Sequence, residues 1–129
     1  SKMNKSIIYS TITGTIVYFA LGWLFYGTLF TDLYPESEGQ SMLYIFLGCL
    51  FYVLIFSIVY SRWAHIGSFR AGAKVGLIMG LLYAVSMNFF MSSSMGDLDI
   101  ERFITDVLIA IVSTVLMGGV VGFTIGKSK

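Results

Sequence analysis

Charged residues are scarce in this 129-residue sequence: Asp, Glu, Lys and Arg together make up 12% of it, against about 25% in soluble domains. Hydrophobic residues make up 57%, and the mean hydropathy is +0.84. A soluble domain of this length could not bury so much apolar surface, because small domains bury only about two-thirds of what their unfolded chains expose. Most of the chain is therefore expected to lie in lipid.

Cysteine and histidine occur once each. The single cysteine, Cys49, excludes an intramolecular disulfide, and the single histidine, His65, has no second ligand of its kind for a metal site. The sequence contains no nucleotide-binding or hydrolase motif. A net charge of +1 leaves no basic face for nucleic acid. We therefore expect no enzyme activity, no catalytic residues, no cofactor, no metal and no nucleic-acid partner.

Proline is absent from four apolar stretches, each long enough to cross a bilayer as a helix, for which about 20 residues suffice. They run over residues 7–30, 42–60, 71–92 and 103–126. The predicted fold is all-α: one integral membrane domain over residues 1–129, built as an antiparallel bundle of four transmembrane helices.

The charged residues divide between the two ends of this predicted bundle. Seven of the eight basic residues lie on the side of the two termini, and all seven acids lie on the other side together with Arg102. Loops rich in Lys and Arg stay in the cytoplasm. Both termini are therefore expected on the cytoplasmic face of a bacterial inner membrane, with two short acidic loops outside and the lipid bilayer as the main partner.

Small residues recur at intervals of four in the last two predicted helices. They are Gly72, Gly76 and Gly80 in the third helix and Gly118, Gly122 and Gly126 in the fourth. Residues four apart share a helix face, and small residues let helices in lipid approach closely. Counted from the end that carries the termini, the two series meet in order, with Gly72 level with Gly126. This pattern predicts a glycine zipper between the two helices, and the alternative is an interface of a homo-oligomer.

Aromatic and polar residues gather in the half of the bundle away from the termini. They are Trp23, Tyr26, Tyr44, Tyr83, Asn88 and Asp106. Counting along the helices places Asn88 level with Ala110, one turn inside Asp106. In one interpretation these residues are packing, and Asn88 bonds to a neighbouring hydroxyl because an unpaired amide is costly in lipid. In the other they line a pocket for a small apolar or amphipathic molecule or a lipid, whose polar head Asp106 orients.

The stretch GWLFYGTLF, residues 22–30, resembles the signature of a small bacterial four-helix membrane family, the domain of unknown function 1761. The matching residues are Tyr26, Gly27, Leu29 and Phe30. Phe25 and Thr28 replace the Trp and Pro of that family, so the match is partial. The last predicted helix is also similar, with Asp106 early and a Gly-Gly pair late. The resemblance implies the four-helix topology and no activity, and it directs attention to Tyr26 and Asp106.

These observations leave three hypotheses for function. The first is a non-enzymatic membrane protein that binds a small apolar or amphipathic molecule, or a lipid, in the outer half of the bundle. The second is a small transporter or channel subunit that works as an oligomer, because four spans are few for a path within one chain. The third is a structural partner of another membrane protein.

Overall fold

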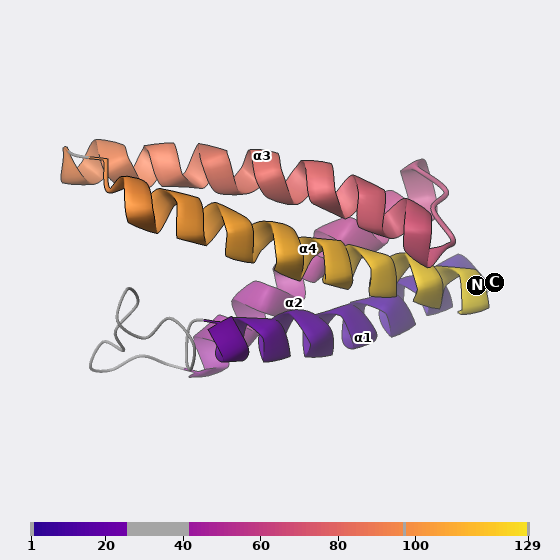
Figure 1. Ribbon diagram of the computed structural model, residues 1–129. Helices are drawn as coiled ribbons and strands as arrows, with labels where there is room; N and C mark the ends of the chain where they lie inside the picture. Colours follow the sequence, from indigo (N-terminus) through magenta and orange to yellow (C-terminus); the bar gives the residue numbers. More distant parts are fainter. Residues whose placement is uncertain (1, 26–41, 97, 129) are drawn as a thin grey trace.

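The structure is a computed structural model that describes residues 2–25, 42–96 and 98–128 (Figure 1). Its elements, in chain order, are α1 (Lys2–Leu24), α2 (Met42–Ile58), the π-helical turn η2 (Val59–Trp63), α3 (Phe69–Met95) and α4 (Ile100–Ser128). The described part of the chain contains no strand. The predicted all-α bundle of four helices is confirmed.

Each helix is long and apolar enough to cross a membrane, as in a multi-pass membrane protein. The candidate spans are Asn4–Leu24, Leu43–Trp63, Phe69–Ser94 and Ile100–Ser128. The helices extend past most ends of the predicted spans, because the flanking polar residues are helical too. The end of the first predicted span, residues 26–30, lies outside the described residues.

Both termini lie at the same end of the bundle (Figure 1). The described part of this end, the basic end, carries Lys5, Arg62, Arg70, Lys74 and Lys127. The opposite end, the acidic end, carries Asp99, Glu101 and Asp106 on the first turns of α4 and just before it. The separation of charge expected from the sequence is therefore present in the described residues.

Local hydrogen bonds fix where α3 and α4 begin and where α3 ends. Ser68 and Asp99 each accept a hydrogen bond of 3.2 Å from the backbone N–H three residues later. Such caps satisfy N–H groups that a first helical turn leaves unpaired. Gly96 ends α3 in the left-handed conformation, at φ 70°, and its N–H donates to the Ser92 carbonyl over 2.8 Å. The connection between the two helices is therefore only four residues long.

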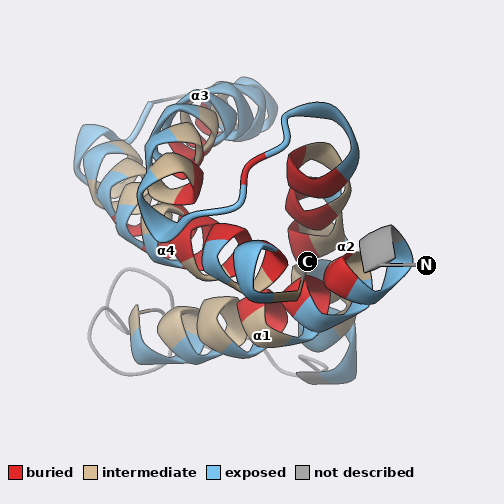
Figure 2. Ribbon diagram, turned by 90° about the vertical axis from the view of Figure 1, so that its right-hand side faces the viewer, coloured by how far each residue is buried: buried red, intermediate tan, exposed pale blue. Residues whose placement is uncertain are grey.

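The central helix is α4, which packs against α1 on one side and α3 on the other (Figures 1 and 2). In its most apolar stretch 50% of the residues are buried, against 22% in each of the other three helices. The core lies between α2, α4 and the turn that follows η2. Its buried residues are Val53, Phe56, Tyr60, Ile66, Met117, Val121 and Ile125.

Glycines bring the backbones of α3 and α4 into contact, but between one and two helical turns away from the predicted register. A Cβ added at Gly118 would lie 2.7 Å from the carbonyl oxygen of Gly72. Gly126, predicted to lie level with Gly72, faces Gly67 before the start of α3. The prediction assumed that both helices start at equal depth in the membrane. The four-residue connection between the two helices sets the register instead.

Hydrogen bonds made by side-chain hydroxyl groups join the helices near the basic end. The hydroxyl groups of Thr13 in α1 and Thr124 in α4 lie 3.0 Å apart. The Tyr60 hydroxyl in η2 donates to the Gly72 carbonyl in α3 over 2.8 Å. Such bonds stabilise helix association in lipid, although each contributes modestly.

Candidate functional site

The structure brings together two of the six residues predicted to form a pocket at the acidic end. Asn88 in α3 is 8% exposed, and its Nδ2 donates to Asp106 Oδ2 in α4 over 2.6 Å and to the Ala84 carbonyl over 2.8 Å. Asn88 therefore lies level with Asp106 and not with Ala110, a shift in the same direction as that of the glycines. Its partners are a carboxylate and a backbone carbonyl, not the hydroxyl expected from the sequence.

The aromatic residues of the predicted pocket lie mainly on the surface. Trp23 and Tyr44 are 61% and 74% exposed. Tyr83 is also exposed, although its ring centroid lies 5.2 Å from that of Tyr52 in α2. Tyr26 lies outside the described residues. The six-residue ligand set as a whole stays a prediction.

A small cavity lies beside the Asn88–Asp106 pair. Its volume is about 20 Å³, and it is lined by Asn88, Met91, Ser92, Asp99, Arg102 and Phe103. A water molecule needs about 10–15 Å³. This cavity therefore has room for one water molecule and not for an organic ligand.

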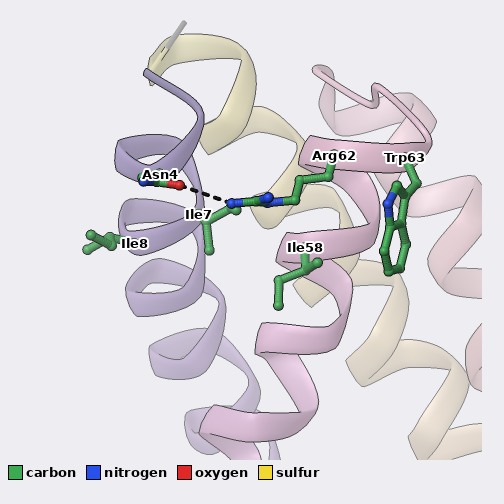
Figure 3. Close-up of a pocket in the computed structure, with 6 residues that line it drawn as sticks. All are labelled: Asn4, Ile7, Ile8, Ile58, Arg62 and Trp63. Carbon is green, nitrogen blue, oxygen red and sulfur yellow. Dashed lines mark hydrogen bonds between the residues drawn. The ribbon is translucent and has the colours of Figure 1, made fainter. Parts of the chain in front are cut away.

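A much larger groove lies at the basic end, between α1 and the end of α2 (Figure 3). Its volume is about 540 Å³, and its lining residues are Asn4, Ile7, Ile8, Ile58, Arg62 and Trp63. Small-molecule sites usually measure about 300–1,000 Å³ and combine apolar walls with a few polar groups. The basic-end groove has this composition: three isoleucines and one indole, with one amide and one guanidinium.

The π-helical turn η2 shapes one wall of the basic-end groove. The Ala64 N–H donates to the Val59 carbonyl five residues earlier, over 2.8 Å, so the end of α2 is wider than an α-helix. His65 then takes the left-handed conformation, at φ 52°. The next residue, Ile66, donates a hydrogen bond from its N–H to the Tyr60 carbonyl over 2.9 Å. π-turns occur often at functional sites.

Arg62 extends from η2 across the groove toward α1 (Figure 3). Its Nη2 donates to Asn4 Oδ1 over 3.1 Å, in an exposed position. Lys5 lies beside Asn4 in the chain, and its Nζ is 5.7 Å from the centroid of the Tyr9 ring. The three acids of the described residues all lie at the acidic end. The head of the basic-end groove is therefore positively charged.

Buried hydroxyl groups run along the faces of α1 and α2 near this groove. The residues of this hydroxyl seam are Ser6, Ser10, Thr11, Thr15, Ser57 and Ser61, and none is more than 6% exposed. Within the described residues, the hydroxyl oxygens of Thr11, Thr15, Ser57 and Ser61 have no hydrogen-bond partner. A Cβ added at Gly14, in line with Ser6 and Ser10 on α1, would lie 2.7 Å from side-chain atoms of Val53 and Val121. Small residues therefore let α1 pack closely on α2 and α4 at this seam.

The basic-end groove and the hydroxyl seam were both missed from the sequence. The seam has a readable signal, because Ser6, Ser10 and Gly14 recur at intervals of four as the glycines of α3 and α4 do. The groove has none, because it depends on how the π-turn directs Arg62 and Trp63.

The side chains that line the basic-end groove suit non-covalent binding. No group of three or more His, Cys, Asp or Glu side chains that could hold a metal ion occurs in the part of the chain that the structure describes. Cys49 is half-buried with a free thiol. The basic-end groove offers apolar walls for a hydrocarbon chain and a guanidinium for a polar head.

Comparisons with models of known families, with curated proteins and with solved structures find no match to this chain. Residues 26–30, which carry the quoted matches to the domain of unknown function 1761, lie outside the described residues. The resemblance to that family therefore stays a prediction.

Proposed function

We propose that this multi-pass membrane protein is not an enzyme and binds an amphipathic lipid molecule in the basic-end groove. The observation that carries the proposal is the composition of that groove: about 540 Å³, mostly apolar walls and a single guanidinium at its head. Ile8 and Trp63 are exposed on its walls, so the groove is open to the surface that lipid would surround. A lipid could therefore enter sideways from the bilayer.

This proposal moves the binding region from the acidic half, where the sequence places it, to the basic end. The reason is the available volume, because the described cavity beside Asn88 and Asp106 holds one water molecule only. Trp63 supports the new location, because tryptophan is enriched where the hydrocarbon core meets the head groups.

The membrane, the orientation and the packing belong to the same proposal. The partition of charge favours a basic end in the cytoplasm and a bacterial inner membrane. The close contacts of Gly72, Gly76 and Gly80 with α4 favour a glycine zipper within one chain, since each would bring a Cβ against atoms of that helix.

The experiment is native mass spectrometry of the protein extracted in a mild detergent. We expect one lipid mass per chain to survive delipidation. Ile58→Phe places a ring in the groove and should remove that mass, whereas Ile78→Phe, the same change at an exposed position on α3, should leave it. Absence of any retained lipid, or equal retention in both variants, would contradict the proposal.

The hydroxyl seam favours a second candidate, a small transporter or channel subunit that works as an oligomer. Buried hydroxyl groups without partners are costly in lipid, and polar residues inside a membrane often mark a path for water or ions. Flux of ions or small polar solutes into proteoliposomes, lost in Thr15→Val and Ser57→Ala, would support this candidate. Tight vesicles with the wild-type protein would count against it.

A further inference from the structure

We infer that the occupant of the basic-end groove is an anionic phospholipid whose phosphate binds Arg62. The inference rests on the groove proposed above and names the chemical class of its ligand. It follows from the charge around Arg62, from the shape of the guanidinium and from the position of the apolar walls.

The charge of Arg62 is not neutralised by the described residues. Its one side-chain hydrogen bond there goes to the neutral amide of Asn4, over 3.1 Å. A guanidinium has five N–H donors in a planar fork, so most of them remain for a ligand. The described acids lie at the far end of the bundle, so none of them supplies an anion to Arg62.

The donor geometry suits a phosphate as the anion that binds Arg62. Two parallel N–H groups of a guanidinium bind two oxygens of a phosphate at once, and such charge-assisted bonds are about twice as strong as neutral ones. The bond to Asn4 holds the guanidinium at the α1 side of the groove (Figure 3). Lys5 is the next residue of α1 and adds a second positive charge at this end.

The apolar walls favour a phosphate that carries hydrocarbon chains. Ile7 and Ile8 lie one turn after Asn4 on α1, and Ile58 lies one turn before Arg62. These side chains are therefore deeper in the bundle than the guanidinium. A phospholipid has the same order along its length, with its phosphate outside and its acyl chains inside.

Other basic residues of this end lack such a setting. Arg70 and Lys74 on α3 are exposed and do not line the groove, so they can reach any lipid head group by extending toward water. Basic pockets between helices, in contrast, bind particular anionic head groups. Arg70 therefore serves as the matched control for Arg62.

The test uses the full chain in detergent, after exhaustive delipidation has removed the retained lipid, and two probes with identical acyl chains, phosphatidylglycerol and phosphatidylcholine. Native mass spectrometry measures the apparent affinity for each lipid. Both lipids carry the phosphate, but the choline of phosphatidylcholine adds a positive charge that Arg62 and Lys5 repel. We therefore expect phosphatidylglycerol to bind about tenfold more tightly. Arg62→Gln should remove this preference, Arg62→Lys should keep part of it, and Arg70→Gln should leave it unchanged.

Three other results would overturn the inference in distinguishable ways. Equal affinities for the two lipids, still abolished by Ile58→Phe, would contradict the anionic ligand and leave the groove in place. Equal losses in Arg62→Gln and Arg70→Gln would attribute the preference to the general charge of the basic end. No binding of either lipid would contradict the groove as well. Circular dichroism of each variant verifies that the helices are intact.

Discussion

The hydroxyl of Tyr60 donates a 2.8 Å hydrogen bond to the backbone carbonyl of Gly72, in a fully buried position. This bond joins the turn after α2 to α3 where α3 packs against α4. Gly118 of α4 lies at the same place, because a Cβ added to it would be 3.0 Å from the Tyr60 hydroxyl. One tyrosine thus links the wall of the basic-end groove to a close contact between α3 and α4.

Tyr60→Phe should lower the free energy of unfolding by about 0.5–1.5 kcal/mol, the usual net contribution of one hydrogen bond. The ring and its packing remain, so the loss reports the bond alone. Reversible unfolding in detergent micelles, followed by circular dichroism, measures it. Tyr9→Phe on the exposed side of α1 is the control and should change nothing. Equal stability of the two variants would mean that the Tyr60 bond contributes nothing.

Gly76→Ala should destabilise the bundle by about 1–3 kcal/mol, as overpacking does. Its Cβ would lie 2.5 Å from the Thr114 carbonyl oxygen, and backbone cannot move aside as a side chain can. Gly48→Ala is the matched control, because no atom lies within 4 Å of a Cβ there, and alanine is the better helix former. Thermal unfolding compares the two.

The same pair of variants separates packing within a chain from an interface between chains. If the glycine face of α3 joins two copies, Gly76→Ala should change the mass of the detergent-solubilised particle while the melting temperature stays the same. Size-exclusion chromatography with light scattering measures that mass. We expect a lower melting temperature at unchanged mass.

Asn88 and Asp106 should be energetically coupled. Polar contacts between membrane helices contribute about 0.6 kcal/mol on average and up to about 1.7 kcal/mol. With a short charge-assisted bond of 2.6 Å, this pair should lie in the upper half of that range. A double-mutant cycle with Asn88→Ala and Asp106→Ala measures the coupling. A value of zero would show that the two side chains do not bond in the protein.

His65→Gly should stabilise the protein by about 1 kcal/mol, because a residue with a Cβ in the left-handed conformation costs about 1–2 kcal/mol. The reciprocal change, Gly96→Ala, should destabilise it by a similar amount, since Gly96 has the same backbone conformation. Both positions are exposed, so the effect is one of backbone conformation. Melting temperatures that move in the same direction for the two variants would contradict the left-handed turns.

The fold follows closely from the sequence, whereas the candidate site does not. Four long apolar stretches and the partition of charge predict four helices and the two unlike ends. The glycine spacing predicts which faces of α3 and α4 meet. The predicted register of these helices was wrong by between one and two turns, because it is set by Gly96 and Asp99 in the connection between them and not by depth in the membrane.

The basic-end groove could not be predicted, because its walls depend on a local departure from α-helical geometry. Nothing in the residues Val59–Trp63 distinguishes a π-turn from the end of an ordinary helix. The π-turn directs the Arg62 side chain toward Asn4 on α1. The hydroxyl seam, in contrast, could have been predicted from the spacing of Ser6 and Ser10.

Photo-crosslinking tests the proposed lipid site most directly. Phosphatidylglycerol with a diazirine near the start of one acyl chain is mixed with the protein in bilayers, irradiated, and its adducts are mapped by peptide mass spectrometry. We expect adducts concentrated on Ile7, Ile8 and Ile58, and lost at about tenfold lower concentrations of unlabelled phosphatidylglycerol than of phosphatidylcholine. Adducts spread evenly over exposed residues such as Leu82 and Phe90, without competition, would show that the groove holds no particular lipid.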